Sequence, residues 1–323
     1  MSRDFDALAP LERYSAASER AADQVIRAYS TSFGAATRLL GPRHRRHVRN
    51  IYALVRVADE LVDGVAAEAH LPSIEQLARL NALETETNNA MRTGYSSNPI
   101  VHAFACTART SGIDAGLTGP FFASMRTDLE PVSITGRATE PARTSAPETL
   151  VASGTGVVSA TGHRFDDDAH ASYVYGSAEV VGLMCLRVFL REETVNDQQR
   201  QQLEHGARSL GAAFQNVNFL RDLADDTERL DRSYLSTDDV ITDDCKADWV
   251  ATIRGQLDAA RDVLPLLPRD ARIAVDTARR LFSKLTDRID QRTVTQLMGQ
   301  RVRVPLPVKL ALIARAIGSR GSA

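Results

Sequence analysis

Apolar residues recur every three or four positions along most of this chain, which is the spacing of helices that bury one face. Alternating apolar and polar runs are nearly absent, so the pattern gives little sign of strands. The pairs Gly41-Pro42, Asn98-Pro99 and Gly119-Pro120 mark turns or helix starts. The pattern therefore predicts an all-α protein, with helices over residues 13–40, 43–65, 73–92, 98–110, 118–130, 167–191, 196–230, 246–265, 268–291 and 305–318.

One segment breaks the helical pattern. Residues 131–162 are dense in Ser, Thr, Gly, Pro and Ala and contain no aromatic side chain. Such a composition buries too little apolar surface to offset the entropy of ordering it, which predicts a flexible surface loop. Neither flank looks self-sufficient, so we expect a single domain over residues 1–323 with this loop inserted. A linker between two domains is the alternative.

The composition is that of an ordinary globular protein and argues against several partners. The 323 residues carry a net charge of -2, so the overall charge gives no reason to expect nucleic-acid binding. Three scattered cysteines, Cys106, Cys185 and Cys245, show no metal-ligand spacing and suit a reduced, cytoplasmic protein. No stretch approaches the roughly 18–20 apolar residues of a spanning helix, and the N-terminus lacks the apolar core of a signal peptide.

Two pairs of aspartates interrupt the apolar pattern in the same way. Asp59 and Asp63 are four residues apart in an otherwise apolar segment, and a helix places such residues on one face. Asp222 and Asp226 repeat this spacing on a second apolar segment. Carboxylates are seldom buried without a partner, because removing the charge from water costs several kcal/mol. One such pair is usually a solvated face, but two in apolar surroundings favour a shared cation site.

Magnesium suits the residues around these aspartates. Mg²⁺ takes oxygen ligands and commonly combines one or two carboxylates with water and phosphate oxygens. Gln215 and Asn218 extend the face of Asp222 at spacings of three and four residues. Arg56 and Arg221 stand close to the aspartates and could each clamp phosphate oxygens bidentately. The residues therefore predict a site where Mg²⁺ bridges two acidic helices to a diphosphate.

Several segments, in this order, resemble the squalene/phytoene synthase family: YSTSF (29–33), YALVRVADELVD (52–63), YVYGSAEVVGLMC (173–185), FQNVNFLRDLADD (214–226) and, more weakly, QRVRVPLPVKLAL (300–312). The resemblance covers most of the chain apart from residues 131–162 and is strongest to bacterial phytoene synthases. It implies an all-α, isoprenoid synthase-type helical bundle around a central apolar cavity. The two aspartate motifs would then face each other across the mouth of that cavity.

The resemblance also implies roles for individual residues. The metal ligands would be Asp59, Glu60, Asp63, Asn218, Asp222 and Asp226. They would hold roughly two or three Mg²⁺ ions, for which Mn²⁺ could substitute. The catalytic set would be Asp59, Asp63, Asp222, Asp226, Arg56 and Arg221. Substrate binding would involve Ser30, Thr31, Ser32, Phe33, Tyr52, Arg56, Gln215, Arg221, Tyr175 and Tyr234.

The implied activity is a prenyltransferase reaction. Two geranylgeranyl diphosphates would condense head to head, with Mg²⁺, to phytoene through a cyclopropylcarbinyl diphosphate. Ionising the diphosphate requires neutralisation of the leaving group, and the carbocation requires a dry apolar cavity. Two alternatives stay open: a dehydrosqualene- or squalene-type synthase that uses farnesyl diphosphate, and a non-catalytic relative that serves as a binding or assembly protein.

The resemblance bears on location as well. The product is insoluble in water, so we expect peripheral contact of a cytoplasmic protein with the inner membrane face. The apolar segment 307–317 carries Lys309 and Arg315, so it could lie on a membrane surface but could not cross. The oligomeric state stays open.

The chain departs from the family pattern after the second aspartate motif. It reads LDRSYLS there, with Asp231 and Ser236 where the family often has Gly and Pro, so we expect altered loop geometry. Elsewhere, the basic run RHRRHVR (43–49) contains no interleaved aromatic residue. It predicts a solvated face or a basic patch on the diphosphate side in preference to a nucleic-acid site.

Overall fold

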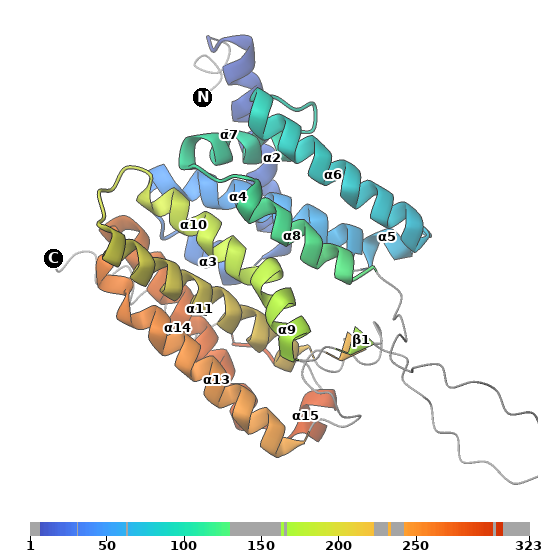
Figure 1. The fold of residues 1–323 in the computed structure, drawn as a ribbon, viewed down its shortest axis with the longest axis vertical. Helices are drawn as coiled ribbons and strands as arrows, with labels where there is room; N and C mark the ends of the chain where they lie inside the picture. Colours follow the sequence, from blue (N-terminus) through green and yellow to red (C-terminus); the bar gives the residue numbers. More distant parts are fainter. Residues whose placement is uncertain are drawn as a thin grey trace, which may run out of the picture.

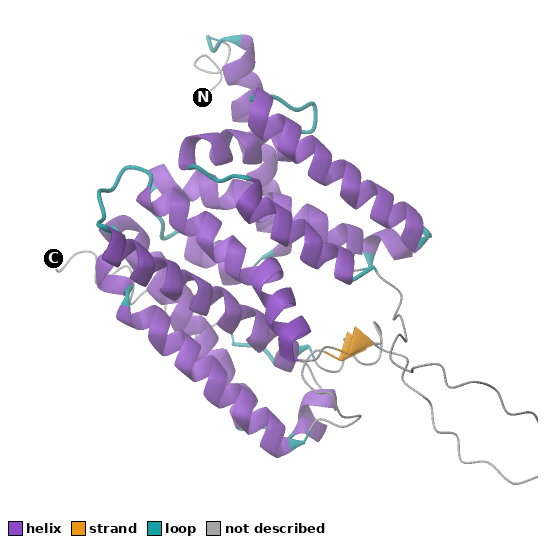
Figure 2. Ribbon diagram, in the orientation of Figure 1, coloured by secondary structure: helices purple, strands orange, loops and turns teal. Residues whose placement is uncertain are grey.

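The computed structural model describes residues 7–30, 32–62, 64–129, 163–164, 167–222, 232–233, 242–299 and 302–305. Within these ranges the chain is almost entirely helical, and the helices pack as a bundle, which confirms the predicted all-α class (Figure 2). The predicted loop at 131–162 and nearly all of the predicted helix at 305–318 lie outside the described residues.

The N-terminal half of the bundle consists of α2 (Pro10–Tyr29), α3 (Ser32–Thr37), α4 (Pro42–Val62), α5 (Val65–Glu68), α6 (Ser73–Thr93), α7 (Pro99–Ser111) and α8 (Ala115–Thr127). The Pro pairs place two of the starts as predicted, since α4 begins at Pro42 and α7 at Pro99. The Asn98 side chain accepts a 3.0 Å hydrogen bond from the Ile100 amide and so caps α7.

The C-terminal half begins with β1 (His163–Arg164), which pairs in parallel with β2 (Arg232–Ser233), a strand that follows α11 in the chain. The helices are α9 (Asp167–Val174), the π-helical turn η1 (Tyr175–Glu179), α10 (Val180–Leu190), α11 (Asp197–Arg221), α13 (Asp243–Asp262), the 3₁₀ turn η2 (Leu264–Leu266), α14 (Arg269–Asp290) and α15 (Val294–Gly299). In Figure 1, α13, α14 and α11 lie together on one side of α10, and α4, α7 and α8 on the other.

Several sequence predictions of element boundaries are wrong. Pro120 does not start a helix but lies inside α8, because Asp114 caps that helix earlier by accepting a 2.9 Å bond from the Gly116 amide. The single helix predicted over 13–40 is two, and α11 ends at Arg221, while residues 223–230 of the helix predicted over 196–230 lie outside the described residues. The pair β1–β2 and the short helices α5 and α15 were not predicted. Elements this short carry too few residues to show a period.

The segment α9–η1–α10 forms one long apolar rod. Residues Asp168–Leu190 make up a helix of 23 residues in which an 18-residue window has a mean hydropathy of 1.4, which is long and apolar enough to cross a membrane by length and composition. The expectation that no stretch reaches this length is therefore wrong. The rod nonetheless packs against α4, α8 and α11 inside the bundle, where a core helix has the same composition (Figure 1).

The rod is also where the helical period changes. The amide of Val180 bonds to the carbonyl of Tyr175, five residues earlier, and this is the hydrogen-bond pattern of a π-helical turn. The extra residue rotates the side chains that follow relative to those that precede it. A strict period of 3.6 residues therefore does not carry through the rod.

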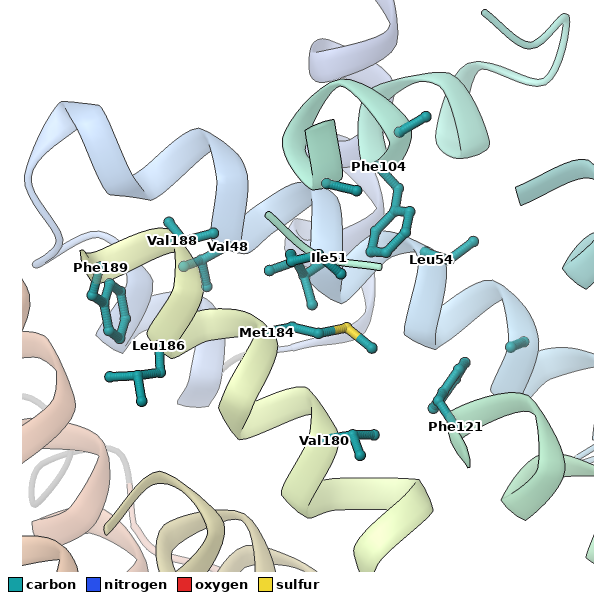
Figure 3. Close-up of a cluster of buried hydrophobic side chains, with 14 of the residues drawn as sticks. Val48, Ile51, Leu54, Phe104, Phe121, Val180, Met184, Leu186, Val188 and Phe189 are labelled. Carbon is teal, nitrogen blue, oxygen red and sulfur yellow. The ribbon is translucent and has the colours of Figure 1, made fainter. Parts of the chain in front are cut away.

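Two clusters of buried apolar residues hold the bundle together. The first joins α4, α7, α8 and α10, and Figure 3 shows Met184 and Val180 of α10 pointing toward Ile51, Leu54 and Phe121. The second joins α11, α13 and α14. A fully buried side chain of this size stabilises the fold by about 1.5–3 kcal/mol. Because members of both clusters line one cavity, that cavity lies between the two halves of the core.

Glycines let α10 and α11 approach each other closely. A Cβ on Gly182 would lie 2.5 Å from the carbonyl oxygen of Ala207, and one on Gly211 would lie 2.5 Å from that of Ala178. Contacts this short do not occur between real atoms, so any larger side chain would push the helices apart. Both glycines line the cavity, whose width therefore depends on this contact.

Candidate active site

A cavity of about 740 Å³ lies between the two halves of the bundle, with walls from α4, α10, α11 and α14. Much of its wall is apolar, formed by side chains such as Val181, Leu186, Phe189, Leu210 and Phe214. The polar lining residues of α4 and α11 belong to the C-terminal parts of those helices: Tyr52, Arg56, Asp59, Gln215, Asn218, Arg221 and Asp222. We call these residues the mouth. Helix C-termini carry partial negative charge, which favours cations at the mouth.

On α4, one arginine pairs with both neighbouring carboxylates. Arg56 forms an ion pair with Glu60, one turn on, and its Nη1 lies 3.8 Å from Asp59 Oδ2. All three side chains are partly buried. The Nε of Arg56 is buried and has no hydrogen-bond partner among the described residues. An unsatisfied buried donor of this kind costs about 1–3 kcal/mol, which an anion bound at the mouth would recover.

The end of α2 covers this arginine. The Arg56 guanidinium carbon lies 4.5 Å from the centre of the Tyr29 ring, a cation–π contact. Burial raises the pKa of Tyr52, while Arg56 and a hydrogen bond with Ser30 act in the opposite direction. Ser30 Oγ also accepts a 3.3 Å bond from the Gly34 amide. The predicted binding residues Ser30, Tyr52 and Arg56 therefore lie together, with Tyr52 and Arg56 facing the cavity.

On α11, the polar residues gather where the helix ends. Asp222 is the C-cap, and its amide bonds to the carbonyl of Asn218 at 2.9 Å. Arg221 Nε donates a 2.8 Å bond to Asp222 Oδ1, and a second ion-pair contact joins the same two side chains. The structure thus brings Asp59 and Asp222 to one cavity, together with Asn218 and Gln215.

The donor chemistry of the mouth fits Mg²⁺. Asp59, Asn218 and Asp222 supply carboxylate and amide oxygens, the hard ligands that Mg²⁺ prefers, and leave coordination positions for water and phosphate oxygens. In the parts of the chain that the structure describes, no three His, Cys, Asp or Glu side chains come together as a metal site. Asp63 and Asp226, the second member of each motif, lie outside the described residues.

Other predicted residues are placed differently. Thr31 and Tyr234 lie outside the described residues, as do the side chains of Ser32 and Phe33. Glu60 pairs with Arg56 but does not line the cavity.

Tyr175 does not line the cavity either. Its ring lies 5.3 Å from the Arg208 guanidinium carbon, and Arg208 Nε donates a 2.6 Å bond to Glu179. Two residues that the sequence reasoning missed line the cavity in the same region: Tyr173, whose hydroxyl donates a 3.0 Å bond to Asp128 Oδ2, and Asp128 itself. The motif YVY offers two tyrosines, and the π turn that begins at Tyr175 decides which one faces inward.

These features define a class of protein: an all-α bundle with an apolar cavity and a mouth lined by acidic residues and arginines from two helices. The fold is shared with a ligand-bound dehydrosqualene synthase, at a TM-score of 0.69 and 18% identity over 98% of this chain and 100% of the other. A squalene synthase from Alicyclobacillus acidocaldarius gives 0.64 and 17% identity, over 87% and 95%.

The sequence comparisons identify the family. The model for squalene/phytoene synthases matches residues 26–248, so this chain belongs to that family. It is 31% identical to a phytoene synthase of Pseudescherichia vulneris over 80% of this chain and 69% of the relative. It is 26% identical to a 15-cis-phytoene synthase of Enterobacter agglomerans, over 90% and 91%. The protein is accordingly a prenyltransferase of the phytoene synthase type, which confirms the predicted resemblance.

Proposed function

We propose that this protein condenses two geranylgeranyl diphosphates head to head to phytoene, through a cyclopropylcarbinyl diphosphate, in a Mg²⁺-dependent reaction. The observation that carries the proposal is the charge distribution of the cavity: arginines and aspartates from α4 and α11 at the mouth, and apolar walls beyond. This arrangement suits a substrate with a diphosphate at one end and a long hydrocarbon chain at the other. The relatives named phytoene synthase support geranylgeranyl diphosphate as the substrate.

The mouth residues would promote loss of the diphosphate. Asp59, Asn218 and Asp222, with Asp63 and Asp226, would hold Mg²⁺, which when bound neutralises the charge of the leaving group. Arg56 and Arg221 would bind the diphosphate oxygens through their guanidinium groups. Ser30, Tyr52 and Gln215 would orient the same group. Fixed charges already in place make the ionisation faster because little reorganisation is then needed.

The cavity wall would control the carbocation. Apolar side chains such as Val181 and Phe214 exclude water and hold the second prenyl chain close to the reacting carbon. Tyr173 lines the cavity, and its hydroxyl donates a 3.0 Å hydrogen bond to Asp128, so the electron-rich ring of this tyrosine would stabilise positive charge in the cavity. We therefore assign cation stabilisation to Tyr173, and not to Tyr175.

The test is an incubation with labelled geranylgeranyl or farnesyl diphosphate, with Mg²⁺ or with EDTA, followed by analysis of the hydrocarbon extract. We expect phytoene from geranylgeranyl diphosphate only, no product with EDTA, and recovery with Mg²⁺ or Mn²⁺. Dehydrosqualene from farnesyl diphosphate would keep the mechanism and change the substrate. No hydrocarbon from either substrate, with folded protein, would contradict the proposal and leave a binding role.

We also propose a cytoplasmic location with peripheral contact at the inner membrane face, because the product is insoluble in water.

A further inference from the structure

Four arginines gather along the seam between α2 and α4, outside the residues assigned to the reaction. Arg27 Nη2 lies 2.7 Å from one oxygen of Asp23, and Arg49 Nη1 lies 2.6 Å from the other. Burial is the main cause that lowers the pKa of the Arg49 guanidinium. The positive charges of Arg45, Arg27 and Arg38 lower it further, so these three arginines lie near Arg49. We call Arg27, Arg38, Arg45 and Arg49 the basic seam.

The basic seam holds excess positive charge in a protein that is otherwise slightly acidic. Residues 19–49 contain seven arginines and two acidic residues, although the whole chain has a net charge of -2. Arg45 directs its Nη2 to the carbonyl oxygen of Leu40, at 2.8 Å, and this neutral acceptor does not offset the positive charge of the arginine. The Nε of Arg49 is buried without a hydrogen-bond partner among the described residues. The electrostatics of the seam therefore favour an anionic partner.

The basic seam leads to the mouth of the cavity. Arg45, Arg49, Tyr52 and Arg56 follow one another at spacings of four, three and four residues, so they share one face of α4. Tyr52 and Arg56 line the cavity, and Arg56 contacts the ring of Tyr29, which is 52% exposed. An exposed aromatic ring thus lies against an arginine of the mouth, two residues beyond Arg27 of the seam. Figure 1 shows α2, α3 and α4 grouped in this part of the bundle.

We propose that the basic seam is a docking surface for an anionic lipid bilayer and that docking places the mouth against the membrane. Arginines near an anionic bilayer are attracted to its phosphate headgroups, and a tyrosine suits the interface because its ring is apolar and its hydroxyl polar. A nucleic acid is the less suitable polyanion, because single strands are bound on several stacking aromatic rings, and among the described residues beside the seam Tyr29 alone is an exposed aromatic. Direct transfer of an amphiphilic prenyl diphosphate from bilayer to cavity would follow, and this consequence alone rests on the proposed function.

Vesicle binding tests the proposal without any substrate. The protein is sedimented with vesicles of phosphatidylglycerol and phosphatidylcholine, or of phosphatidylcholine alone. We expect binding only to the anionic vesicles, and release at about 1 M salt, where the Debye length falls to about 3 Å. Arg38→Gln with Arg45→Gln should weaken the binding about thirtyfold, since each arginine near an anionic surface contributes about five- to sixfold. The matched control is Arg79→Gln with Arg187→Gln, two exposed arginines elsewhere that change the net charge equally.

The outcomes separate docking from catalysis. Equal losses in the two double variants, or equal binding to neutral vesicles, would overturn the proposal, as would binding to a single-stranded oligonucleotide but not to anionic vesicles. Because Arg45 also bonds to the backbone carbonyl of Leu40, a second variant, Arg27→Gln with Arg38→Gln, must show the same loss; both arginines are exposed, and Arg27 pairs with Asp23 on its own helix. Turnover of detergent-dispersed substrate should be unchanged in these variants. A protein that binds vesicles but makes no hydrocarbon would contradict the proposed function and leave docking standing.

Discussion

Helix α4 forms arginine–carboxylate contacts near both of its ends, and the two sets differ in what they connect. In its C-terminal part, at the mouth, Arg56 pairs with Asp59 and Glu60 on the same helix. At its N-terminus, Arg43 crosses to α14, where it donates bonds of 2.8 and 2.9 Å to the two oxygens of Asp270. It also reaches Glu193, just after α10, at 2.8 Å. We call Arg43, His44, Glu192, Glu193 and Asp270 the anchor.

The difference shows how one kind of interaction serves two purposes. Contacts between helices, as in the anchor, hold α4, α10 and α14 in place, and the bidentate geometry makes them strong and specific. Contacts within one helix contribute little to the packing of the bundle, typically a few tenths of a kcal/mol. The charged groups at the mouth can therefore exchange partners when a ligand binds, without loss of the fold. Changes at the mouth should affect turnover, and changes in the anchor should affect stability.

The largest effect is expected from the carboxylates of the mouth. Asp59→Asn and Asp222→Asn should each lower kcat about 100- to 1000-fold, because each removes charge that stabilises the transition state, while the melting temperature stays near that of the parent. Steady-state kinetics and thermal denaturation check both parts. A large drop in melting temperature, or nearly full turnover in either variant, would contradict the assignment of turnover to the mouth and of stability to the anchor.

The next effect concerns the anchor. Asp270→Asn should destabilise the fold by about 2–3 kcal/mol, since it leaves Arg43 without its bidentate partner and weakens the 3.2 Å contact with His44. Urea denaturation measures the change in the free energy of unfolding. The control is Asp276→Asn on the same helix, whose partners Arg279 and Arg280 are its own neighbours on α14, and a change below about 0.5 kcal/mol is expected there. Equal losses in the two variants would remove the distinction.

The sequence indicated the mouth better than the anchor, for a physical reason. Asp59 and Asp222 were found because an acidic side chain at a fixed offset in an apolar helix is unusual, and this signal is local. The anchor joins residues far apart along the chain, such as Arg43 and Asp270, which are 227 positions apart. Nothing in the neighbourhood of either residue marks the other, so only the packing of the helices brings them together.

Tyr175 was predicted to bind substrate but does not line the cavity, for a related reason. The helical period predicts which residues share a face only while the hydrogen-bond pattern stays constant. The π turn at Tyr175–Glu179 changes that pattern, and Tyr173 lines the cavity while Tyr175 packs beneath Arg208. The sequence shows Gly176 in this stretch, but a π turn has no reliable sequence signal. The helices themselves were predicted well because their apolar faces repeat over many turns.

Acid should lower the free energy of unfolding through His47, which lies on α4 near the anchor. Burial, with a smaller effect from Arg46, lowers the pKa of His47 from 6.5 to about 4. The unfolded chain binds this proton more readily than the folded chain does. The contribution of neutral His47 to the free energy of unfolding is therefore complete above pH 6.5 and is lost as the pH falls toward 4. At pH 5 the loss is about 2 kcal/mol. The pKa of His44 is also lowered by burial, so its protonation destabilises the fold in the same direction. Arg43 is the main cause that lowers the pKa of Asp270 from 3.8 to about 2, so protonation of this carboxylate causes a further loss of stability between pH 3.8 and pH 2.

Denaturation across this pH range tests the assignment to His47. His47→Gln should flatten the dependence of the unfolding free energy between pH 6.5 and 4 by about one proton, because glutamine keeps a hydrogen-bonding group but does not titrate. The 2.9 Å contact between His47 Nδ1 and Thr107 Oγ1 shows where that group is needed. An unchanged slope in the variant would assign the acid sensitivity to other groups.

The smallest effect concerns the contact that sets the width of the cavity between the mouth and the anchor. Gly211→Ala should destabilise the fold by about 1–2 kcal/mol, because the added Cβ would collide with the carbonyl of Ala178 in η1 and push η1, with the α10 that continues it, from α11. Gly255→Ala on α13, where nothing lies within 4 Å, should instead stabilise the fold by about 0.5–1 kcal/mol through helix propensity. Opposite signs in thermal denaturation would show that Gly211 is required by the close approach of the two helices. Stabilisation in both variants would mean that α10 and α11 can separate freely, and the cavity would then lack the fixed width that holding two prenyl chains together requires.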